Sequence, residues 1–229
     1  MIAVIFDLDG TLVDSEPNYY ESGRRTLERH GVTDFTWEDH AEYIGIGTLE
    51  TLEILRDLHG IETPVEVLLA EQNAAYLELA RTATPVFPQM RAFVEGLHAA
   101  GVPMAVASGS SRAAIDAVLD GTGLSELLTT VISAEEVERG KPEPDVFLAA
   151  AELLGTDPAD CLVLEDAVPG ALAAKAAGMS CVVLPYTERS AEDPAFADVT
   201  LLVRGGQDAF DAAEMLDWFA ARRTEPVRD

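Results

Sequence analysis

Two aspartates separated by a single residue, Asp7 and Asp9, follow directly on an apolar run at residues 2–6. Five unbroken apolar residues predict a strand that is buried on both faces, as the strands of parallel sheets are. Side chains at i and i+2 of an extended chain point to the same side, so the two carboxylates should converge where this strand ends. Converging acids repel one another unless a cation or a shared proton compensates them. Open α/β sheets hold their ligands at this edge, so we expect the functional site here.

Four further reactive residues stand where predicted strands end or predicted helices begin: Ser108, Lys141, Glu165 and Asp166. A doubly wound sheet can bring such turns together although they lie far apart in the sequence. Several carboxylates without a neighbouring histidine favour a hard cation, and Mg²⁺ fits because it takes few carboxylates and keeps its waters. A metal, a lysine, a hydroxyl and a helix N-terminus together can bind phosphate. Such a site could support phosphoryl transfer, with an aspartate as the covalent nucleophile.

The elements that must position these residues alternate between apolar runs and segments of helical period. The predicted strands are residues 2–6, 104–107, 131–133, 162–164, 182–184 and 199–203. Alternation of strands and helices predicts an α/β fold with a doubly wound, Rossmann-like parallel sheet.

Residues 16–84 break this alternation, because they contain helical patterns and no convincing strand. One of these helices is expected to begin at residues 63–66, Thr-Pro-Val-Glu, as a capping box with proline at the first helical position. An insertion of roughly a third of the chain is too long for a loop. We expect a core of residues 1–15 and 85–229 and a small all-helical cap domain, residues 16–84, over the strand ends.

The composition excludes some classes of binding partner. The 229 residues carry 15 basic and 41 acidic side chains, a net charge of −26, which repels nucleic acid and anionic membranes. No apolar stretch approaches the length of a membrane helix, and the N-terminus lacks the features of a signal peptide. Cys161 and Cys181 lie in or beside apolar runs and are expected to be reduced and buried. We expect a cytoplasmic protein, monomeric or weakly dimeric, in which an anionic substrate would need a local cation to enter this negative field.

Four segments resemble the motifs of the haloacid dehalogenase (HAD) superfamily in order and spacing. They read Asp-Leu-Asp-Gly-Thr-Leu-Val-Asp at 7–14, Val-Ala-Ser-Gly at 106–109, Lys-Pro-Glu-Pro-Asp at 141–145 and Glu-Asp-Ala-Val-Pro-Gly at 165–170. The resemblance extends over essentially the whole chain, and the helical insertion is similar to the small cap of the branch that holds sugar-phosphate phosphatases and β-phosphoglucomutases.

This resemblance implies the catalytic and metal-binding roles. Asp7 would attack phosphorus and form an aspartyl-phosphate, and Asp9 would protonate the leaving oxygen and then activate water. Mg²⁺ would be held by the Asp7 carboxylate, the Asp9 main-chain carbonyl and Asp166. Glu165 would contact the metal or orient its waters, although it could instead simply fix the turn that follows it.

The resemblance also implies the phosphate-binding residues. Ser108 and Lys141 would bind the transferring phosphoryl group, and the main chain at Gly109 could add an N–H donor. After this strand, Ser110 or Ser111 is expected to cap the next helix.

Departures from related sequences separate the candidate functions. Dehalogenases and phosphonate hydrolases of the family lack an acid at the second aspartate, so Asp9 favours phosphate-ester chemistry. Mutases carry a histidine where Tyr19 stands, and a lysine and an arginine where residues 43–48 read Tyr-Ile-Gly-Ile-Gly-Thr. The resemblance therefore implies a Mg²⁺-dependent phosphatase for a small phosphomonoester, such as a sugar or polyol phosphate. The alternatives are a hexose-phosphate mutase of the β-phosphoglucomutase type and a catalytically silent metal- or phosphate-binding module.

Overall fold

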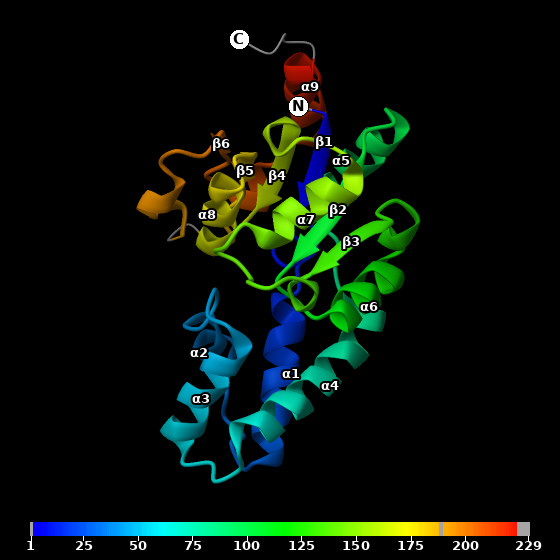
Figure 1. Ribbon diagram of the computed structural model, residues 1–229. Coiled ribbons are helices and arrows are strands. Elements are labelled where there is room, and N and C mark those ends of the chain that lie inside the picture. Colours follow the sequence, from blue (N-terminus) through cyan, green and yellow to red (C-terminus); the bar gives the residue numbers. More distant parts are fainter. Residues whose placement is uncertain (1, 188–189, 224–229) are drawn as a thin grey trace. The chain divides into compact units, whose positions relative to one another are not determined.

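Strands and helices alternate along most of the chain in the computed structural model, which describes residues 2–187 and 190–223 (Figure 1). The chain forms two compact units. One comprises Met1–Asp14 together with Pro85–Asp229, and the other is Ser15–Thr84.

The first unit is built on a six-stranded sheet in the order β3-β2-β1-β4-β5-β6, in which every pair of neighbouring strands is parallel. The strands are β1 (Ala3–Phe6), β2 (Met104–Ser108), β3 (Thr130–Ser133), β4 (Cys161–Glu165), β5 (Ser180–Val183) and β6 (Leu201–Leu202). This topology confirms the predicted α/β class. The sheet order places β1 between β2 and β4. The residues that follow β1 therefore reach the same edge of the sheet as the residues that follow β4.

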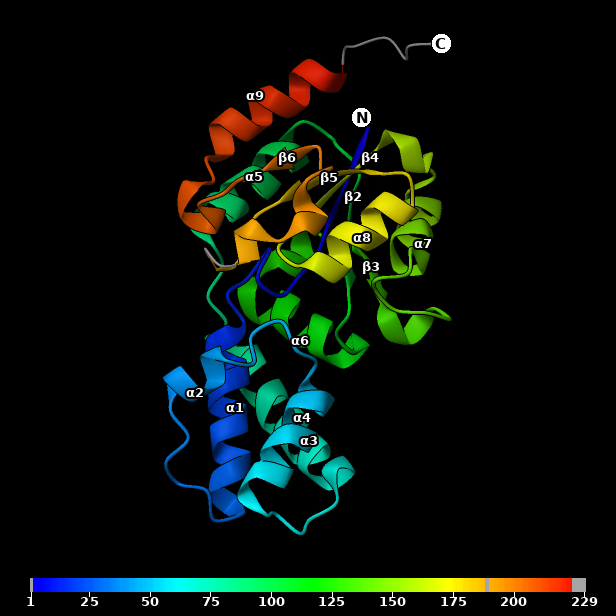
Figure 2. The same ribbon diagram turned by 90° about the vertical axis from the view of Figure 1, so that its left-hand side faces the viewer.

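Helices cover both faces of this sheet (Figure 2). They are α5 (Pro88–Ala99), α6 (Arg112–Thr122), α7 (Asp145–Leu154), α8 (Val168–Ala176) and α9 (Ala212–Arg223). Helices α7 and α8 lie on one face, where Ile5 and Val163 pack with Phe147 in an apolar cluster. Helices α5 and α9 lie on the other face, where Phe93 makes edge-to-face contacts with Phe6 and Phe210. Burial on both faces explains why the first strand is apolar at every position.

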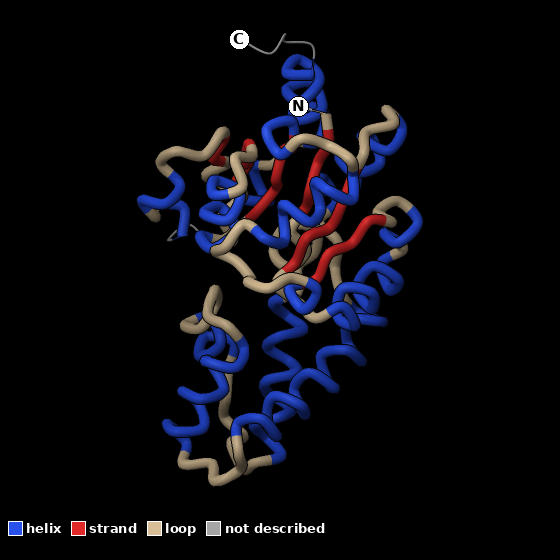
Figure 3. Tube along the Cα trace, viewed as in Figure 1, coloured by secondary structure: helices blue, strands red, loops and turns tan. Residues whose placement is uncertain are grey.

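The second unit, Ser15–Thr84, consists of helices and loops, and none of its residues forms a strand (Figure 3). Its helices are α1 (Glu16–Arg29), α2 (Trp37–Ala41), α3 (Thr48–His59) and α4 (Val65–Ala83). Leu27, Val32, Phe35 and Leu55 form one apolar cluster of this unit. Its role as a cap stays a prediction. Across the part of the chain that the structure describes, no helix combines the length and the apolar character that crossing a bilayer requires.

The start of α4 differs from the sequence prediction. Pro64 precedes the first helical residue, Val65, and no side chain caps this end, so the predicted capping box is wrong. The Thr63 hydroxyl instead lies 3.2 Å from Nδ1 of His30, whose Nε2 lies 2.9 Å from a carboxylate oxygen of Glu71. A partner at the end of α1, remote in sequence, has replaced the local hydrogen bond that the pattern favours.

The two cysteines fit the prediction from composition. Cys161 in β4 and Cys181 in β5 are free thiols, and both are buried. Burial raises the pKa of the Cys161 thiol to about 11 and that of Cys181 further. At neutral pH both therefore stay protonated and pack as small apolar side chains.

Candidate active site

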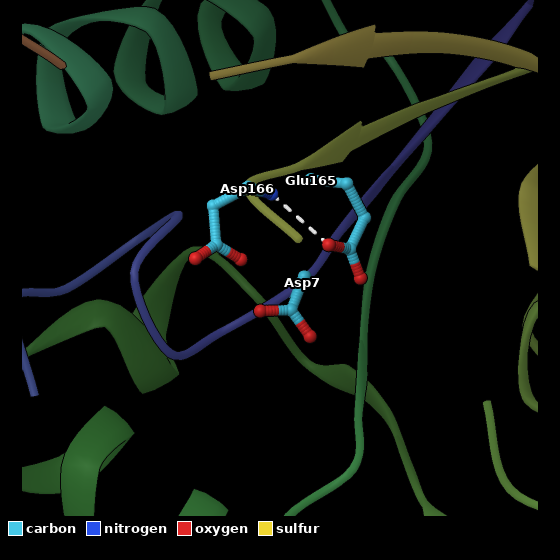
Figure 4. Close-up of side chains that lie close together, drawn as sticks. All are labelled: Asp7, Glu165 and Asp166. Atoms are coloured by element: carbon cyan, nitrogen blue, oxygen red, sulfur yellow. Dashed lines mark hydrogen bonds between the residues drawn. The ribbon is translucent and has the colours of Figure 1, made fainter. Parts of the chain in front are cut away.

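Three carboxylates meet where β1 and β4 end. Asp7 follows β1 directly, Glu165 is the last residue of β4, and Asp166 comes next. The two strands are parallel neighbours, and the Asp7 N–H extends their pairing by donating to the carbonyl of Leu164 at 2.9 Å. One carboxylate oxygen from each of the three acids lies within 4.8 Å of the others (Figure 4). This is the point of the sheet where chain connections leave in opposite directions, which is where open α/β sheets bind ligands.

The chemistry of this cluster fits a divalent cation. Asp7 and Glu165 are 6% and 2% exposed, so the cluster holds negative charge away from water. Burial raises the pKa of Asp7 to about 7, against the opposing effect of Lys141 and with the help of Glu165 and Asp9. Burial and the neighbouring acids likewise raise the pKa of Asp166 well above its usual range. A set of carboxylate oxygens whose negative charge is not fully neutralised by nearby cations suits Mg²⁺.

Gly10 makes room for one of these acids. Its φ of 77° lies in the left-handed region that favours glycine, and a Cβ at this position would overlap the Asp166 carboxylate. The glycine of the Asp-x-Asp-Gly sequence is thus explained by the close approach of Asp166, which follows β4.

Lys141 cross-links two of the acids. Its ammonium donates to Asp7 Oδ1 at 2.5 Å and to Glu165 Oε1 at 2.6 Å, and it lies 4.8 Å from the centre of the Phe147 ring. Burial alone would lower the pKa of this lysine, but the two carboxylates more than offset that effect and the pKa is raised. Lys141 is therefore charged and neutralises part of the acidic cluster. Its predicted contact with a phosphoryl group stays a prediction.

Glu165 also holds the turn that carries Asp166. Its Oε2 accepts the main-chain N–H groups of Asp166 and Ala167, both at 3.0 Å, while its Oε1 faces Lys141. A Cβ at Gly170, in the first turn of α8, would overlap this carboxylate. The turn-fixing interpretation of Glu165 therefore has direct contacts behind it, and ligation of a metal by Glu165 stays a prediction.

Hydroxyl groups form the other side of the site, at the end of β2. The buried Ser108 accepts the Ser110 N–H through its Oγ at 3.0 Å. The Ser110 hydroxyl donates to Asp9 Oδ2 at 2.7 Å, whereas Ser111 caps α6. Asp9 is thus held by a serine, apart from the cluster of Asp7, Glu165 and Asp166.

Sequence reasoning did not identify Ser133 as part of this side. It is the last residue of β3, is fully buried, and is paired in register with Ser108. Its hydroxyl donates to the carbonyl of Ser110 at 2.7 Å. The available signal was a serine at the end of a predicted strand. By contrast, Gly109 is exposed and has open space where a side chain would stand.

The structure therefore brings the candidate residues together in two groups. Asp7, Lys141, Glu165 and Asp166 form one, and Asp9 with Ser108 and two further serines forms the other. The roles assigned to Asp9, Ser108 and Gly109 by resemblance stay predictions.

Comparisons with known proteins find a matching family and several relatives. A family model described as haloacid dehalogenase-like hydrolase matches residues 1–178. The bifunctional riboflavin kinase/FMN phosphatase of Arabidopsis thaliana is 34% identical over 186 residues, 80% of this chain. The chain spans 48% of the length of that relative. The fructose-1-phosphate phosphatase YqaB of Escherichia coli is 32% identical over 179 residues, which are 78% of this chain and 94% of that protein.

A solved structure shares the fold over most of this chain. It is a mutant of CbbY from Rhodobacter sphaeroides in complex with xylulose-(1,5)bisphosphate, with 26% sequence identity and a TM-score of 0.74. The likeness covers 92% of this chain and 100% of that chain.

Proposed function

This chain belongs to the haloacid dehalogenase-like hydrolases, and from that premise we propose that it is a Mg²⁺-dependent phosphatase of small phosphomonoesters. The observation that carries the proposal is the buried cluster of Asp7, Glu165 and Asp166 cross-linked by Lys141 at the ends of β1 and β4. A carboxylate nucleophile, a cation and a lysine within one cluster are the parts that phosphoryl transfer through a covalent intermediate needs.

The chemistry proceeds in two displacements. A carboxylate oxygen of Asp7 attacks phosphorus, the bond from phosphorus to the ester oxygen breaks, and an aspartyl-phosphate forms. Asp9 gives its proton to the departing alkoxide, and it then takes a proton from the water that attacks the phosphorus of the intermediate. As the water oxygen bonds to phosphorus, the bond from phosphorus to the Asp7 oxygen breaks, so inorganic phosphate leaves and the Asp7 carboxylate is regenerated. The hydrogen bond from Ser110 keeps the Asp9 carboxylate at the end of β2.

The remaining residues hold and neutralise the reactants. Asp7 and Asp166 would hold Mg²⁺, together with the main-chain carbonyl of Asp9, and Glu165 supports them from the adjoining turn. When bound, the ion supplies positive charge that stabilises the anionic phosphoryl group. Ser108 and Lys141 would contact the phosphoryl oxygens from the two sides of the site.

The substrate class follows from the relatives. YqaB is named a fructose-1-phosphate phosphatase, and CbbY was solved with xylulose-(1,5)bisphosphate. A small sugar phosphate or polyol phosphate is accordingly the class of substrate that we propose. The missing histidine at Tyr19 and the missing cations at residues 43–48 support hydrolysis over mutase chemistry.

The decisive experiment measures phosphate release from p-nitrophenyl phosphate and from a panel of sugar and polyol phosphates, with and without Mg²⁺. Asp7→Asn should lower the rate by roughly 10⁴-fold or more, because the amide is a poor nucleophile. Asp116→Asn is the matched control, since Asp116 pairs with Arg112 on the surface of α6, and it should keep full activity. Activity of Asp7→Asn close to wild type would rule out the nucleophile. Interconversion of hexose 1- and 6-phosphates without phosphate release would instead establish the mutase.

A further inference from the structure

We propose that Gln207 is a positioning residue for the metal site, because it holds the turn after Asp9 from a segment of the chain beyond the family motifs. The proposal rests on the proposed function for the identity of the cation. Gln207 lies in a short 3-10 helix, Gly206–Ala209, whereas the family model ends at residue 178. No motif in the sequence points to this residue.

The contact is made to the main chain of the turn. Nε2 of Gln207 donates to the carbonyl of Gly10 at 3.2 Å and to the carbonyl of Thr11 at 2.8 Å. Thr11 is fully buried, so its carbonyl needs a partner from the protein. One amide group thus satisfies two successive carbonyls of the turn.

Within the turn, main-chain N–H groups are paired with main-chain carbonyls, but not with the carbonyls of Gly10 and Thr11. The Gly10 N–H donates to the Val13 carbonyl at 2.9 Å, and the N–H groups of Leu12 and Val13 both donate to the Leu8 carbonyl, at 2.9 and 3.1 Å. These bonds close the turn from within. They do not involve the carbonyls of Gly10 and Thr11, which are the groups that Gln207 holds.

The turn is coupled to the acidic cluster through Gly10. There is no space for a Cβ between Gly10 and the Asp166 carboxylate, so this carboxylate packs directly against the main chain of Gly10. A small shift of the turn therefore changes the position that the Asp166 carboxylate can take. Gln207 therefore acts on Asp166 through Gly10, without touching the acid.

The part of the chain between β5 and Gln207 also contacts the other end of the first motif, residues 7–14. The Tyr186 hydroxyl donates to Asp14 Oδ1 at 2.9 Å. Gly206, which precedes Gln207, has a φ of 56°, and a Cβ there would overlap the carbonyl of Pro185. The chain after β5 is thus folded back on itself in a way that presents Gln207 to the turn.

The test uses a substitution that keeps the size of the side chain and removes its donors. Gln207→Met removes both hydrogen bonds, and Gln207→Ala is the second variant. Gln89→Met is the matched control, because Gln89 also joins the C-terminal segment to the core, but its side-chain oxygen accepts the Ala212 N–H at 3.1 Å, at the start of α9 rather than at the turn. Mg²⁺ affinity is measured by titration calorimetry on the full chain without substrate, and amide hydrogen exchange is followed at Gly10, Leu12 and Val13.

We expect Gln207→Met to weaken Mg²⁺ binding by roughly tenfold, the effect typical of groups that orient metal ligands, and to speed exchange of the three amides. In assays of phosphate release, the Mg²⁺ concentration for half-maximal rate should rise, with little change in the KM for the ester. Gln89→Met should match wild type in all of these. Equal Mg²⁺ affinity of Gln207→Met and Gln89→Met would overturn the proposal, as would a wild-type chain that binds no Mg²⁺. A wild type that binds Mg²⁺ but hydrolyses no ester would refute the proposed function alone.

Discussion

The two sides of the candidate site are held by different physical forces. At the ends of β1 and β4, Asp7, Lys141 and Glu165 form a buried ionic network in which each charge needs the others. At the ends of β2 and β3, Ser110 and Ser133 form a chain of neutral donors that reaches Asp9. Removal of one buried ionic partner leaves a charge without compensation, whereas a lost hydroxyl costs about one hydrogen bond.

The packing around the glycines of the site also differs between its two sides. On the charged side, Gly170 and Gly10 each lie so close to a carboxylate that a Cβ would overlap it. On the hydroxyl side, Gly109 has open space around it. The charged side therefore tolerates little change in shape or in protonation, and the hydroxyl side tolerates more. Substitutions on either side test this contrast.

The largest effect is expected from Lys141→Met. It leaves Asp7 and Glu165 buried without their cation, which should lower the free energy of unfolding by about 3–5 kcal/mol in the absence of metal. Lys175→Met is the control, because Lys175 pairs with Asp198 on the surface, where such pairs contribute about 0–1 kcal/mol. Urea denaturation of both variants measures the difference. Similar losses in the two variants would contradict the ionic account of the charged side.

The next effect concerns Mg²⁺ and pH. The pKa of Asp7 is raised from its usual 3.8 to about 7 in the folded, metal-free chain, chiefly by burial. Stability contributed by the protonated form is therefore present at low pH and lost as the pH rises through about 7. Bound Mg²⁺ requires the ionised acid, so its stabilising effect should grow over the same range.

Thermal unfolding with and without Mg²⁺, at constant ionic strength, checks this expectation. At about 100 times the dissociation constant, the midpoint should rise by roughly 5–10 °C near pH 8 and by much less near pH 5. In Asp7→Asn the dependence on pH should weaken, because only one of the two acids whose pKa is raised, Asp166, then remains in the cluster. A shift that is as large near pH 5 as near pH 8 would refute the coupling.

A smaller effect is expected from an alanine in place of glycine. Within a helix, Gly→Ala normally stabilises by about 1 kcal/mol. In Gly170→Ala, however, the new Cβ would overlap the Glu165 carboxylate, and we expect a net destabilisation of about 2 kcal/mol. Gly109→Ala, on the open side, should change the stability by less than about 0.5 kcal/mol. If denaturant midpoints show Gly170→Ala to be the more stable of the two, the packing contrast is wrong.

The sequence was sufficient to bring the acids of the charged side together, because strand ends are predictable. Apolar runs placed the ends of β1 and β4 within about two residues, and the parallel order then requires Asp7 and Asp166 to lie at one edge. The position of Lys141 between two acids was not predictable, since it depends on a loop whose path no local pattern specifies.

On the hydroxyl side, local sequence patterns do not determine which side chains make contact. Ser110 and Ser111 are equivalent as candidate caps, and only the tertiary structure assigns the cap to Ser111 and the contact with Asp9 to Ser110. Thr63 is a similar case, because its pattern predicts a cap but its hydroxyl lies against His30. Gln207 belongs to no pattern, and its contacts with the turn arise from the return of the chain after β5. In each case a partner distant in sequence decides the outcome.

The smallest effect on stability, and the sharpest comparison, comes from these adjacent serines. Ser111→Ala removes the cap of α6, which should cost about 1 kcal/mol and leave turnover unchanged. Ser110→Ala removes one hydrogen bond, a loss of similar size, but that bond helps to position the carboxylate of Asp9, which must carry the proton. We expect kcat to fall by about tenfold in Ser110→Ala, with little change in KM, because proton transfer depends on the position of the acid. Denaturation and steady-state kinetics on both variants separate the two roles. Equal kcat values at equal stability would mean that the hydroxyl side positions nothing, and that the charged side alone organises the site.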